Sequence, residues 1–188
     1  MERVVRLLAC LVVIGVLAIG CGDGGDGPPE LAVPSTGATP SAVPESSPAA
    51  DPAVEALAAY EAMWKVYDEA AQDPQADPQE AGLERYATGD ALAVVTDLLA
   101  SLREDGLVAR GSIDHSPEVT RMSPVDDPTR VRVEDCADSS GRTVERADGG
   151  PYDDDPGGLR LIFADVANDE GMWKVTTLGI GQVGSCRG

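Results

Sequence analysis

The chain has 188 residues and a formal net charge of −19 at pH 7, with 33 acidic against 14 basic side chains. This composition argues against a nucleic-acid partner, because proteins that bind DNA or RNA cluster Lys and Arg. It also argues against docking on an anionic lipid surface. No Ser-His-Asp arrangement, phosphate-binding glycine loop or zinc motif occurs in the sequence, so no cofactor and no metal is indicated.

The first 20 residues predict an export signal. Arg3 and Arg6 form a short basic stretch, and an uncharged apolar run follows over residues 7–19. As a helix this run would be roughly 20 Å long, which is shorter than the roughly 30 Å hydrocarbon core of a bilayer. It is therefore typical of the hydrophobic region of a signal peptide and not of a membrane-spanning helix.

A cysteine follows this apolar run directly. The sequence Ala18-Ile19-Gly20-Cys21 resembles the lipobox of bacterial lipoproteins, in which the cysteine receives a diacylglyceryl group and becomes the new N-terminus. The resemblance implies that Cys21 anchors the protein to a membrane, stably because more than one acyl chain enters the bilayer. Two alternatives are an ordinary secretory signal with an incidental cysteine, and an earlier lipobox that ends at Cys10, with almost no apolar stretch before it.

Residues 21–51 predict a flexible, disordered linker. They are rich in Gly, Pro, Ser, Ala and Thr and contain no aromatic side chain. Such a segment cannot bury enough apolar surface to offset the entropy lost on ordering. As a coil it spans on the order of 30 Å. The remaining residues, 52–188, have the length of a single domain.

Three helices are expected at the start of this domain. Asp51-Pro52 gives a helix N-cap followed by proline at the first helical position. The apolar face of this first helix recurs every three or four residues, at Leu57, Tyr60, Trp64, Tyr67 and Ala71. A capping-box pattern predicts a second, shorter helix from Asp77. A third helix is expected from about Asp90 to Gly106, with an apolar face of Leu92, Val95, Leu99 and Leu102.

Strands are expected in the second half of the domain. Residues 107–122 predict one long bent strand, in which Pro117 requires an edge or a bulge. Residues 130–134 alternate between apolar and polar side chains, so one face of that strand is buried. Residues 159–166 are almost all apolar, and residues 172–180 complete the set.

The connections between these strands favour an antiparallel sheet. Asn168-Asp169-Glu170-Gly171 is typical of a hairpin turn. Residues 139–158 are polar and rich in Gly and Asp, so a loop is expected there. The run Asp153-Asp154-Asp155 lacks the ligand spacing of a calcium loop and is interpreted as a solvated part of that loop. Helices followed by antiparallel strands form an α+β pattern.

The cysteines left after export form a pair. With Cys10 removed and Cys21 lipidated, Cys136 and Cys186 remain. In an oxidising compartment they predict a disulfide. A bridge that closes a loop of about 50 residues contributes about 4 kcal/mol in the chain-entropy model.

Four short motifs carry a further resemblance: Tyr60-Glu61-Ala62-Met63-Trp64, Arg85-Tyr86-Ala87-Thr88-Gly89-Asp90-Ala91-Leu92, Val133-Glu134-Asp135-Cys136-Ala137-Asp138 and Trp173-Lys174-Val175. Together with the order of elements, they resemble actinobacterial lipoproteins of unassigned function. Those proteins resemble the nuclear-transport-factor-2-like (SnoaL-like) fold, in which a curved sheet wraps over helices and leaves a cavity. The resemblance implies N-terminal helices packed on a curved, cone-like antiparallel sheet of about four strands.

Two polar residues are candidates for chemistry in such a fold. His115 is in phase with Ile113, and Asp135 continues the Val131–Val133 face, so alternation turns its carboxylate inward. Enzymes of this fold use a carboxylate or a histidine–aspartate pair as the base in an apolar pocket. The plainer interpretations are a half-buried or surface histidine and an acid at a strand end that meets solvent or Arg132. Trp64 and Trp173 are interpreted as core residues.

The sequence thus favours a non-enzymatic binding or scaffold module of the cell envelope, lipid-anchored on the extracytoplasmic face of the cell membrane. Its partner would be an envelope protein or a small apolar ligand. The alternative is a small isomerase or cyclase-type enzyme that uses Asp135 or His115 as its base. A contiguous exposed apolar patch on the domain favours a protein partner.

Overall fold

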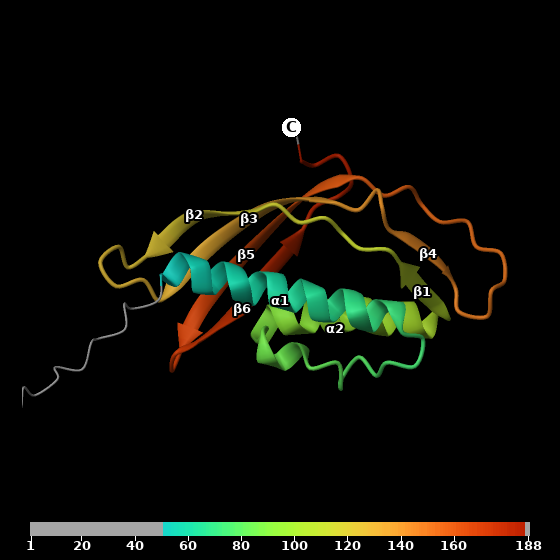
Figure 1. Ribbon diagram of the computed structural model, residues 1–188, viewed down its shortest axis with the longest axis horizontal. Coiled ribbons are helices and arrows are strands. Elements are labelled where there is room, and N and C mark those ends of the chain that lie inside the picture. The colour runs from blue at the N-terminus through green and yellow to red at the C-terminus, as the bar shows by residue number, and fades with distance from the viewer. Residues whose placement is uncertain (1–50, 187–188) are drawn as a thin grey trace, which may run out of the picture. The chain divides into compact units, whose positions relative to one another are not determined.

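Two helices lie against one face of a four-stranded antiparallel sheet (Figure 1). The computed structural model describes residues 51–186, so the expected signal peptide, Cys21 and residues 22–50 of the expected linker lie outside the described residues. The helices are α1 (Pro52–Gln72) and α2 (Gly89–Glu104). The four-stranded sheet has the order β2 (Pro117–Ser123), β3 (Arg130–Asp138), β5 (Leu159–Asp169), β6 (Met172–Ile180), and β1 (Leu107–Arg110) pairs separately with β4 (Thr143–Arg146). The predicted α+β class is confirmed.

Helix α1 begins and packs as its sequence predicts. The Asp51 carboxylate accepts a hydrogen bond of 2.9 Å from the Ala53 backbone N–H, and Pro52 is the first helical residue. Of its predicted apolar face, Tyr60, Trp64, Tyr67 and Ala71 are buried, and Leu57 packs at the edge of the core.

The predicted second helix is wrong. Only a three-residue 3-10 turn, Leu83–Arg85, forms in this region. The Asp77 carboxylate accepts from the Gln79 backbone N–H at 2.8 Å and closes a local turn in place of a helix start. Helix α2 then follows with Val95 and Leu99 buried, and Gly106, at φ 65°, follows its C-terminus as predicted.

The predicted long strand over residues 107–122 is two strands. The chain turns sharply at Gly111, where φ is 77° and a Cβ would collide with the backbone carbonyl of Gly141. Strand β1 therefore pairs with β4, which lies inside the segment predicted to be a loop. Strand β2 starts at Pro117, as an edge strand of the larger sheet with a bulge between Val119 and Arg121.

The β5–β6 hairpin is confirmed. Asp169 pairs with Met172 across the turn, and the Asn168 side chain accepts from the Gly171 backbone N–H at 2.9 Å. Glu170 and Gly171 have φ of 52° and 86°, as a tight hairpin turn requires.

The two faces of the four-stranded sheet differ in what covers them. The inner face packs on α1 and α2, and its side chains are fully buried: Val131, Val133, Ile162, Ala164, Val166 and Val175. Trp64 and Trp173 are buried in this core, as predicted. The outer face, which we define as the side chains turned away from the helices, is partly exposed.

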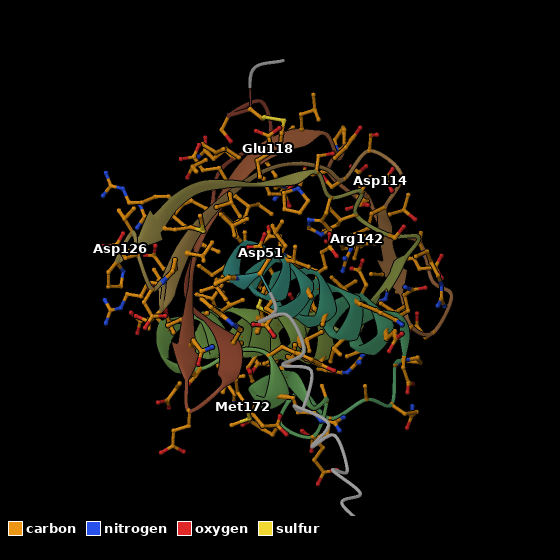
Figure 2. All side chains as sticks on the ribbon, turned by 60° about the vertical axis from the view of Figure 1, so that its left-hand side comes forward. Asp51, Asp114, Glu118, Asp126, Arg142 and Met172 are labelled. Atoms are coloured by element: carbon orange, nitrogen blue, oxygen red, sulfur yellow. A yellow bond between two sulfur atoms is a disulfide. The ribbon has the colours of Figure 1, made fainter. Side chains whose placement is uncertain are left out.

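The predicted disulfide joins Cys136 on β3 to Cys186 near the chain end (Figure 2), with 5.7 Å between the two Cα atoms. The tail before Cys186 also bonds to β5, because the Gly184 backbone N–H donates to the Leu159 carbonyl. The bridge therefore fastens the C-terminal tail to the sheet. Within residues 51–186, no helix combines the length and apolar character needed to cross a membrane.

Candidate functional site

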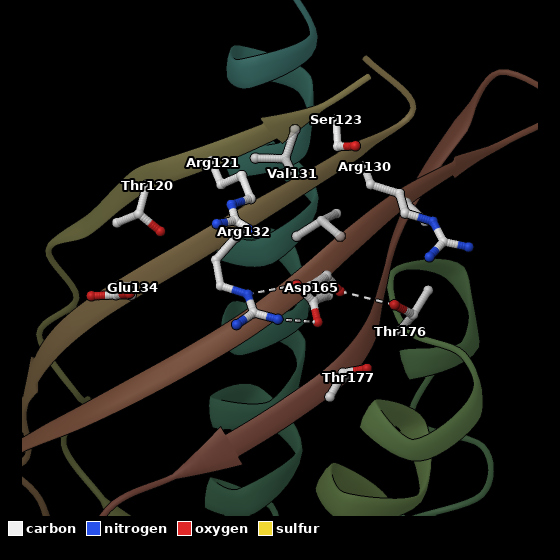
Figure 3. Close-up of a pocket in the computed structure, with 12 residues that line it drawn as sticks. Thr120, Arg121, Ser123, Arg130, Val131, Arg132, Glu134, Asp165, Thr176 and Thr177 are labelled. Atoms are coloured by element: carbon white, nitrogen blue, oxygen red, sulfur yellow. Dashed lines mark hydrogen bonds and ion pairs between the residues drawn. The ribbon is translucent and has the colours of Figure 1, made fainter. Parts of the chain in front are cut away.

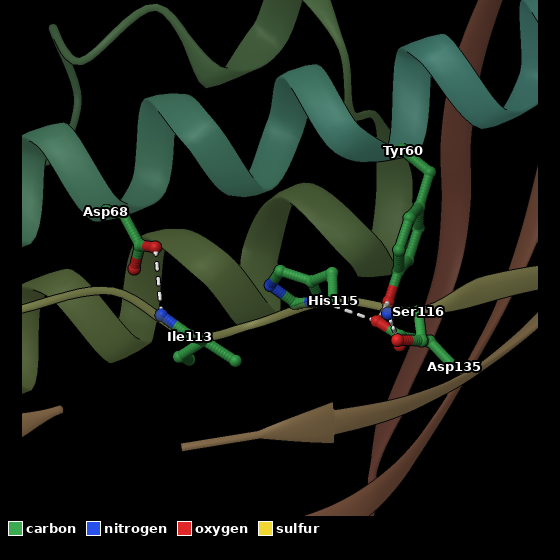
Figure 4. A network of polar contacts seen from close by, with 6 residues as sticks. All are labelled: Tyr60, Asp68, Ile113, His115, Ser116 and Asp135. Carbon is green, nitrogen blue, oxygen red and sulfur yellow. Dashed lines mark hydrogen bonds and ion pairs between the residues drawn. The ribbon is translucent and has the colours of Figure 1, made fainter. Parts of the chain in front are cut away.

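A buried polar network joins α1 to the inner face of the sheet (Figure 4). Asp135 on β3 points inward and is only 1% exposed, as the strand alternation predicts. Its Oδ2 accepts a hydrogen bond of 2.8 Å from the Tyr60 hydroxyl and lies 2.5 Å from Nδ1 of His115. Its Oδ1 accepts from the Ser116 backbone N–H at 2.8 Å. Three donors from two elements therefore enclose one carboxylate.

The segment between β1 and β2 holds His115 in place. On one side, Ser116 donates to Asp135; on the other, the Ile113 backbone N–H donates to the Asp68 carboxylate at 3.4 Å. Asp68 also pairs with Arg142, at 2.5 Å between Oδ1 and Nη1. The backbone on both sides of His115 is thus attached to acids, through Ile113 to Asp68 on α1 and through Ser116 to Asp135 on β3.

Aromatic side chains of α1 complete the surroundings of His115. Its ring stacks on Trp64, with centroids 5.0 Å apart and an interplanar angle of 26°. Tyr60 approaches it edge-on at 6.0 Å. The histidine side chain is 13% exposed, so it is largely buried by these contacts. His115 is therefore half-buried, which is one of the two placements expected for it. The interpretation of Asp135 as an acid that meets Arg132 or solvent is wrong, because that side chain is buried.

The network fixes the protonation of two of its members. Burial alone would raise the pKa of Asp135, but hydrogen bonds from His115, Ser116 and Tyr60 outweigh it and hold that pKa below its ordinary value of 3.8. Burial, together with the neighbouring Asp135 charge, raises the pKa of Tyr60 far above its usual range. Asp135 is therefore a carboxylate and Tyr60 a neutral donor at neutral pH. Nδ1 of His115 must then carry the hydrogen that it shares with Asp135, because a carboxylate only accepts.

This arrangement leaves the second ring nitrogen of His115 uncommitted among residues 51–186. With Nδ1 committed to Asp135, Nε2 of His115 is the nitrogen that could accept a proton or a hydrogen bond from a bound molecule. Nε2 is buried and has no hydrogen-bond partner among residues 51–186. Asp135 is buried and already accepts three hydrogen bonds, one of them shared with His115, so it holds the orientation of the His115 ring.

A cavity of about 430 Å³ lies beside His115. It lies between Glu61, Trp64 and Lys65 of α1 and the segment 112–115. The accessible lining of this cavity is mostly apolar, and charged side chains such as Glu61 and Lys65 stand around the surfaces of Trp64 and Ile113. Within the described part of the chain, no group of three or more His, Cys, Asp or Glu side chains could hold a metal ion. Of the acidic run interpreted as solvated, Asp153 and Asp155 are exposed, but Asp154 is half-buried and its carboxylate accepts a hydrogen bond of 2.6 Å from the Val144 backbone N–H.

A second concave site lies on the outer face of the sheet (Figure 3). This outer hollow has a volume of about 640 Å³ and extends over β2, β3, β5 and β6. Arg121, Arg130 and Arg132 line it and are called here the arginine cluster. Arg132 forms two hydrogen bonds of 2.7 Å with the carboxylate of Asp165, from Nε and from Nη2.

An exposed apolar row adjoins this hollow along β5. Leu159, Leu161 and Phe163 alternate on one strand, so they share the outer face, and they are 41%, 37% and 44% exposed. The Phe163 ring lies across Gly179 of β6, where a Cβ would collide with it. We call these three residues the apolar row.

Sequence reasoning identified His115 and Asp135 as separate candidates, and the structure brings them together. It did not identify Tyr60, which the helical spacing assigned to the core, nor the arginine cluster. The clean alternation of residues 130–134 placed Arg130 and Arg132 on a wet face, and this was the available signal for the outer site.

No known family model matches the chain, and no curated protein matches its sequence. Among solved structures, the chain is similar to the crystal structure of the intermembrane space region of the chloroplast protein ARC6, at 18% sequence identity and a TM-score of 0.49. The alignment covers 70% of this chain and 98% of that one. This likeness concerns the course of the chain and supports no statement about activity.

Proposed function

We propose that this protein is a non-enzymatic binding module of the bacterial cell envelope that binds a protein partner through the outer face of its sheet. The apolar row is the observation that carries this proposal. Leu159, Leu161 and Phe163 form a continuous exposed line on the sheet face that the helices leave uncovered. Exposed apolar side chains gathered in one place are typical of surfaces that bind other proteins.

The proposed setting follows from the N-terminal sequence. A lipid on Cys21 would hold the chain to the extracytoplasmic face of the cell membrane, and residues 22–50 would separate the domain from the bilayer. The Cys136–Cys186 disulfide is consistent with an oxidising compartment. The helices packed on one sheet face also agree with a cone-like, nuclear-transport-factor-2-like domain, which we propose as the fold family.

The experiment that tests this function is crosslinking in cells with the full-length, tagged protein, followed by mass spectrometry. Wild type is compared with Leu161→Asp/Phe163→Asp and with Val125→Asp, a control on a residue that is 85% exposed. Thermal melting first checks that all three are folded. We expect an envelope protein to be recovered with wild type and the control but not with the double variant. Recovery of the same proteins from all three would refute the proposal.

One observation favours a second candidate function, a small isomerase or cyclase-type enzyme. Nε2 of His115 is oriented by Asp135, has no partner within residues 51–186 and belongs to a residue that lines a cavity. Native mass spectrometry of protein purified from its host would show a small molecule if this cavity binds one. Loss of that molecule in Ile113→Trp, which fills the cavity, would favour the enzyme; an unchanged spectrum would count against it.

A further inference from the structure

The arginine cluster stands out against the charge of the chain. The sequence has 33 acidic and 14 basic side chains, yet three arginines lie together on the outer face. Arg121 is directly opposite Arg132 in the β2–β3 register, and Ser123 is opposite Arg130. Like charges opposite each other on one face destabilise a sheet unless an anion offsets them, and Asp165 offsets the charge of Arg132.

Only one of the three arginines is neutralised within the domain. Arg132 is held by Asp165, whereas the guanidinium groups of Arg121 and Arg130 have no ion-pair or hydrogen-bond partner among residues 51–186. Arg121 lies opposite Arg132, and Arg130 is two positions before Arg132 on the same strand. Arg121 and Arg130 are therefore diagonal neighbours, and the Cα atoms of such a pair are roughly 7–8 Å apart. Their side chains can reach a single anionic group between them.

The remaining side chains of the outer hollow suit a polar anionic ligand. Thr120, Ser123 and Thr177 contribute hydroxyl groups that can donate hydrogen bonds. Glu134 closes the opposite end of the hollow and pairs in register with Glu118. The negative charges of these glutamates direct a bound anion to the Arg121–Arg130 end. Guanidinium groups bind carboxylates with paired hydrogen bonds.

We infer that Arg121 and Arg130 bind a carboxylate-bearing segment of the partner protein, whose neighbouring apolar side chains lie on the apolar row. This inference rests on the proposed function and names the chemistry of its partner. The net charge of −19 repels extended polyanions such as nucleic acids and anionic membranes. A short acidic segment brings only a few charges, and Phe163 stands next to the hollow, opposite Glu134 in the β3–β5 register.

The direct test uses the full chain and a fluorescein-labelled peptide of alternating aspartate and leucine, with fluorescence anisotropy as the readout. The variants are Arg121→Gln/Arg130→Gln and the control Arg110→Gln, an exposed arginine of β1 that pairs with Glu145. We expect wild type and the control to bind alike and the double variant to bind at least roughly tenfold more weakly, since two charge-assisted contacts are lost. Binding should also weaken as salt rises.

Several results would overturn the inference. They are the absence of binding, equal binding by the double variant, equal binding of a lysine–leucine peptide, and preferential binding to vesicles that contain anionic lipid. Crosslinking in cells separates the two proposals. If the partner is lost in Leu161→Asp/Phe163→Asp but retained in Arg121→Gln/Arg130→Gln, the proposed function stands and the carboxylate inference fails.

Discussion

The hydroxyl of Tyr60 on α1 donates a hydrogen bond of 2.8 Å to the carboxylate of Asp135 on β3, across 75 positions of sequence. Neither group reaches solvent to any extent, because Tyr60 is fully buried and Asp135 is 1% exposed. A buried carboxylate is stable only when donors replace its water. This bond, with those of His115 and Ser116, therefore ties the first helix, the β1–β2 connection and the central strand to one ion.

The first prediction concerns the loss of this ion. Asp135→Asn removes the charge and leaves Tyr60, His115 and Ser116 with a poorer acceptor, so we expect the free energy of unfolding to fall by about 1–3 kcal/mol at pH 7. Urea denaturation followed by circular dichroism measures it. The control is Asp153→Asn, a substitution at an exposed loop residue. Equal midpoints for both variants would contradict the structural role of Asp135.

The second prediction concerns pH. Because folding holds the pKa of Asp135 below its ordinary value of 3.8, the unfolded chain binds a proton more readily at this site than the folded protein does. The stabilisation is fully present above pH 3.8 and is lost as the pH falls through the lower folded pKa. We expect wild type to lose stability more steeply than Asp135→Asn below that pH. Parallel denaturation midpoints from pH 5 to pH 2 would rule this out.

The third prediction concerns the disulfide. Cys136→Ser/Cys186→Ser removes the bridge that fastens the tail to β3, and we expect a loss of about 2–4 kcal/mol. Limited proteolysis should then cut the segment 181–186 first, while wild type treated with a reductant should behave like the double variant. If the tail of the double variant resisted the protease as well as wild type does, its backbone bonds to β5 would be enough to hold it and the prediction would be wrong.

The fourth prediction compares two ion pairs that both involve an arginine. Asp68–Arg142 is largely buried, at 13% and 9% side-chain exposure, whereas Arg110–Glu145 is half exposed. Double-mutant cycles should give about 0.2–1 kcal/mol for the exposed pair and a larger coupling for Asp68–Arg142, because solvent screens it less. Equal coupling energies would contradict the larger contribution expected of the buried pair.

The fifth prediction concerns the proposed anchor at Cys21. Without an acyl-accepting cysteine the chain has no lipid to insert, so Cys21→Ser should appear in the medium or in the soluble envelope fraction. Cell fractionation and immunoblotting measure it, with Cys10→Ser as the matched control. Membrane retention of Cys21→Ser, or release of Cys10→Ser, would place the anchor elsewhere.

Much of the fold was predictable because its signals are local. The spacing of Tyr60, Trp64 and Tyr67 marks α1, and alternation over residues 130–134 marks β3 and turns Asp135 inward. The break at Gly111 was missed, because it depends on the close approach of Gly141, thirty positions further on. The pairing of β1 with β4 follows from that break and has no separate local signal.

The candidate sites show the same division between local and long-range information. Strand phase selected His115 and Asp135 one at a time, but their contact depends on how the β1–β2 connection crosses β3. Tyr60 was assigned to the core because aromatic spacing on a helix does not reveal a buried hydroxyl partner. The arginine cluster depends on the register of β2 against β3, which places Arg121 opposite Arg132, and no single strand contains that information.

The short segment Tyr86–Thr88 bears on how copies of this domain can associate. Ala87 forms a parallel bridge with Val175, so the outward N–H and C=O of Val175 in the middle of β6 are already used, by Tyr86 and Thr88. Strand β2, at the opposite end of the sheet order, has no further strand beside it within residues 51–186. Within the four-stranded sheet, this segment therefore obstructs strand addition at the middle of β6, whereas the edge of β2 stays open to it. Two copies of the domain would therefore meet edge to edge more readily through β2 than through β6.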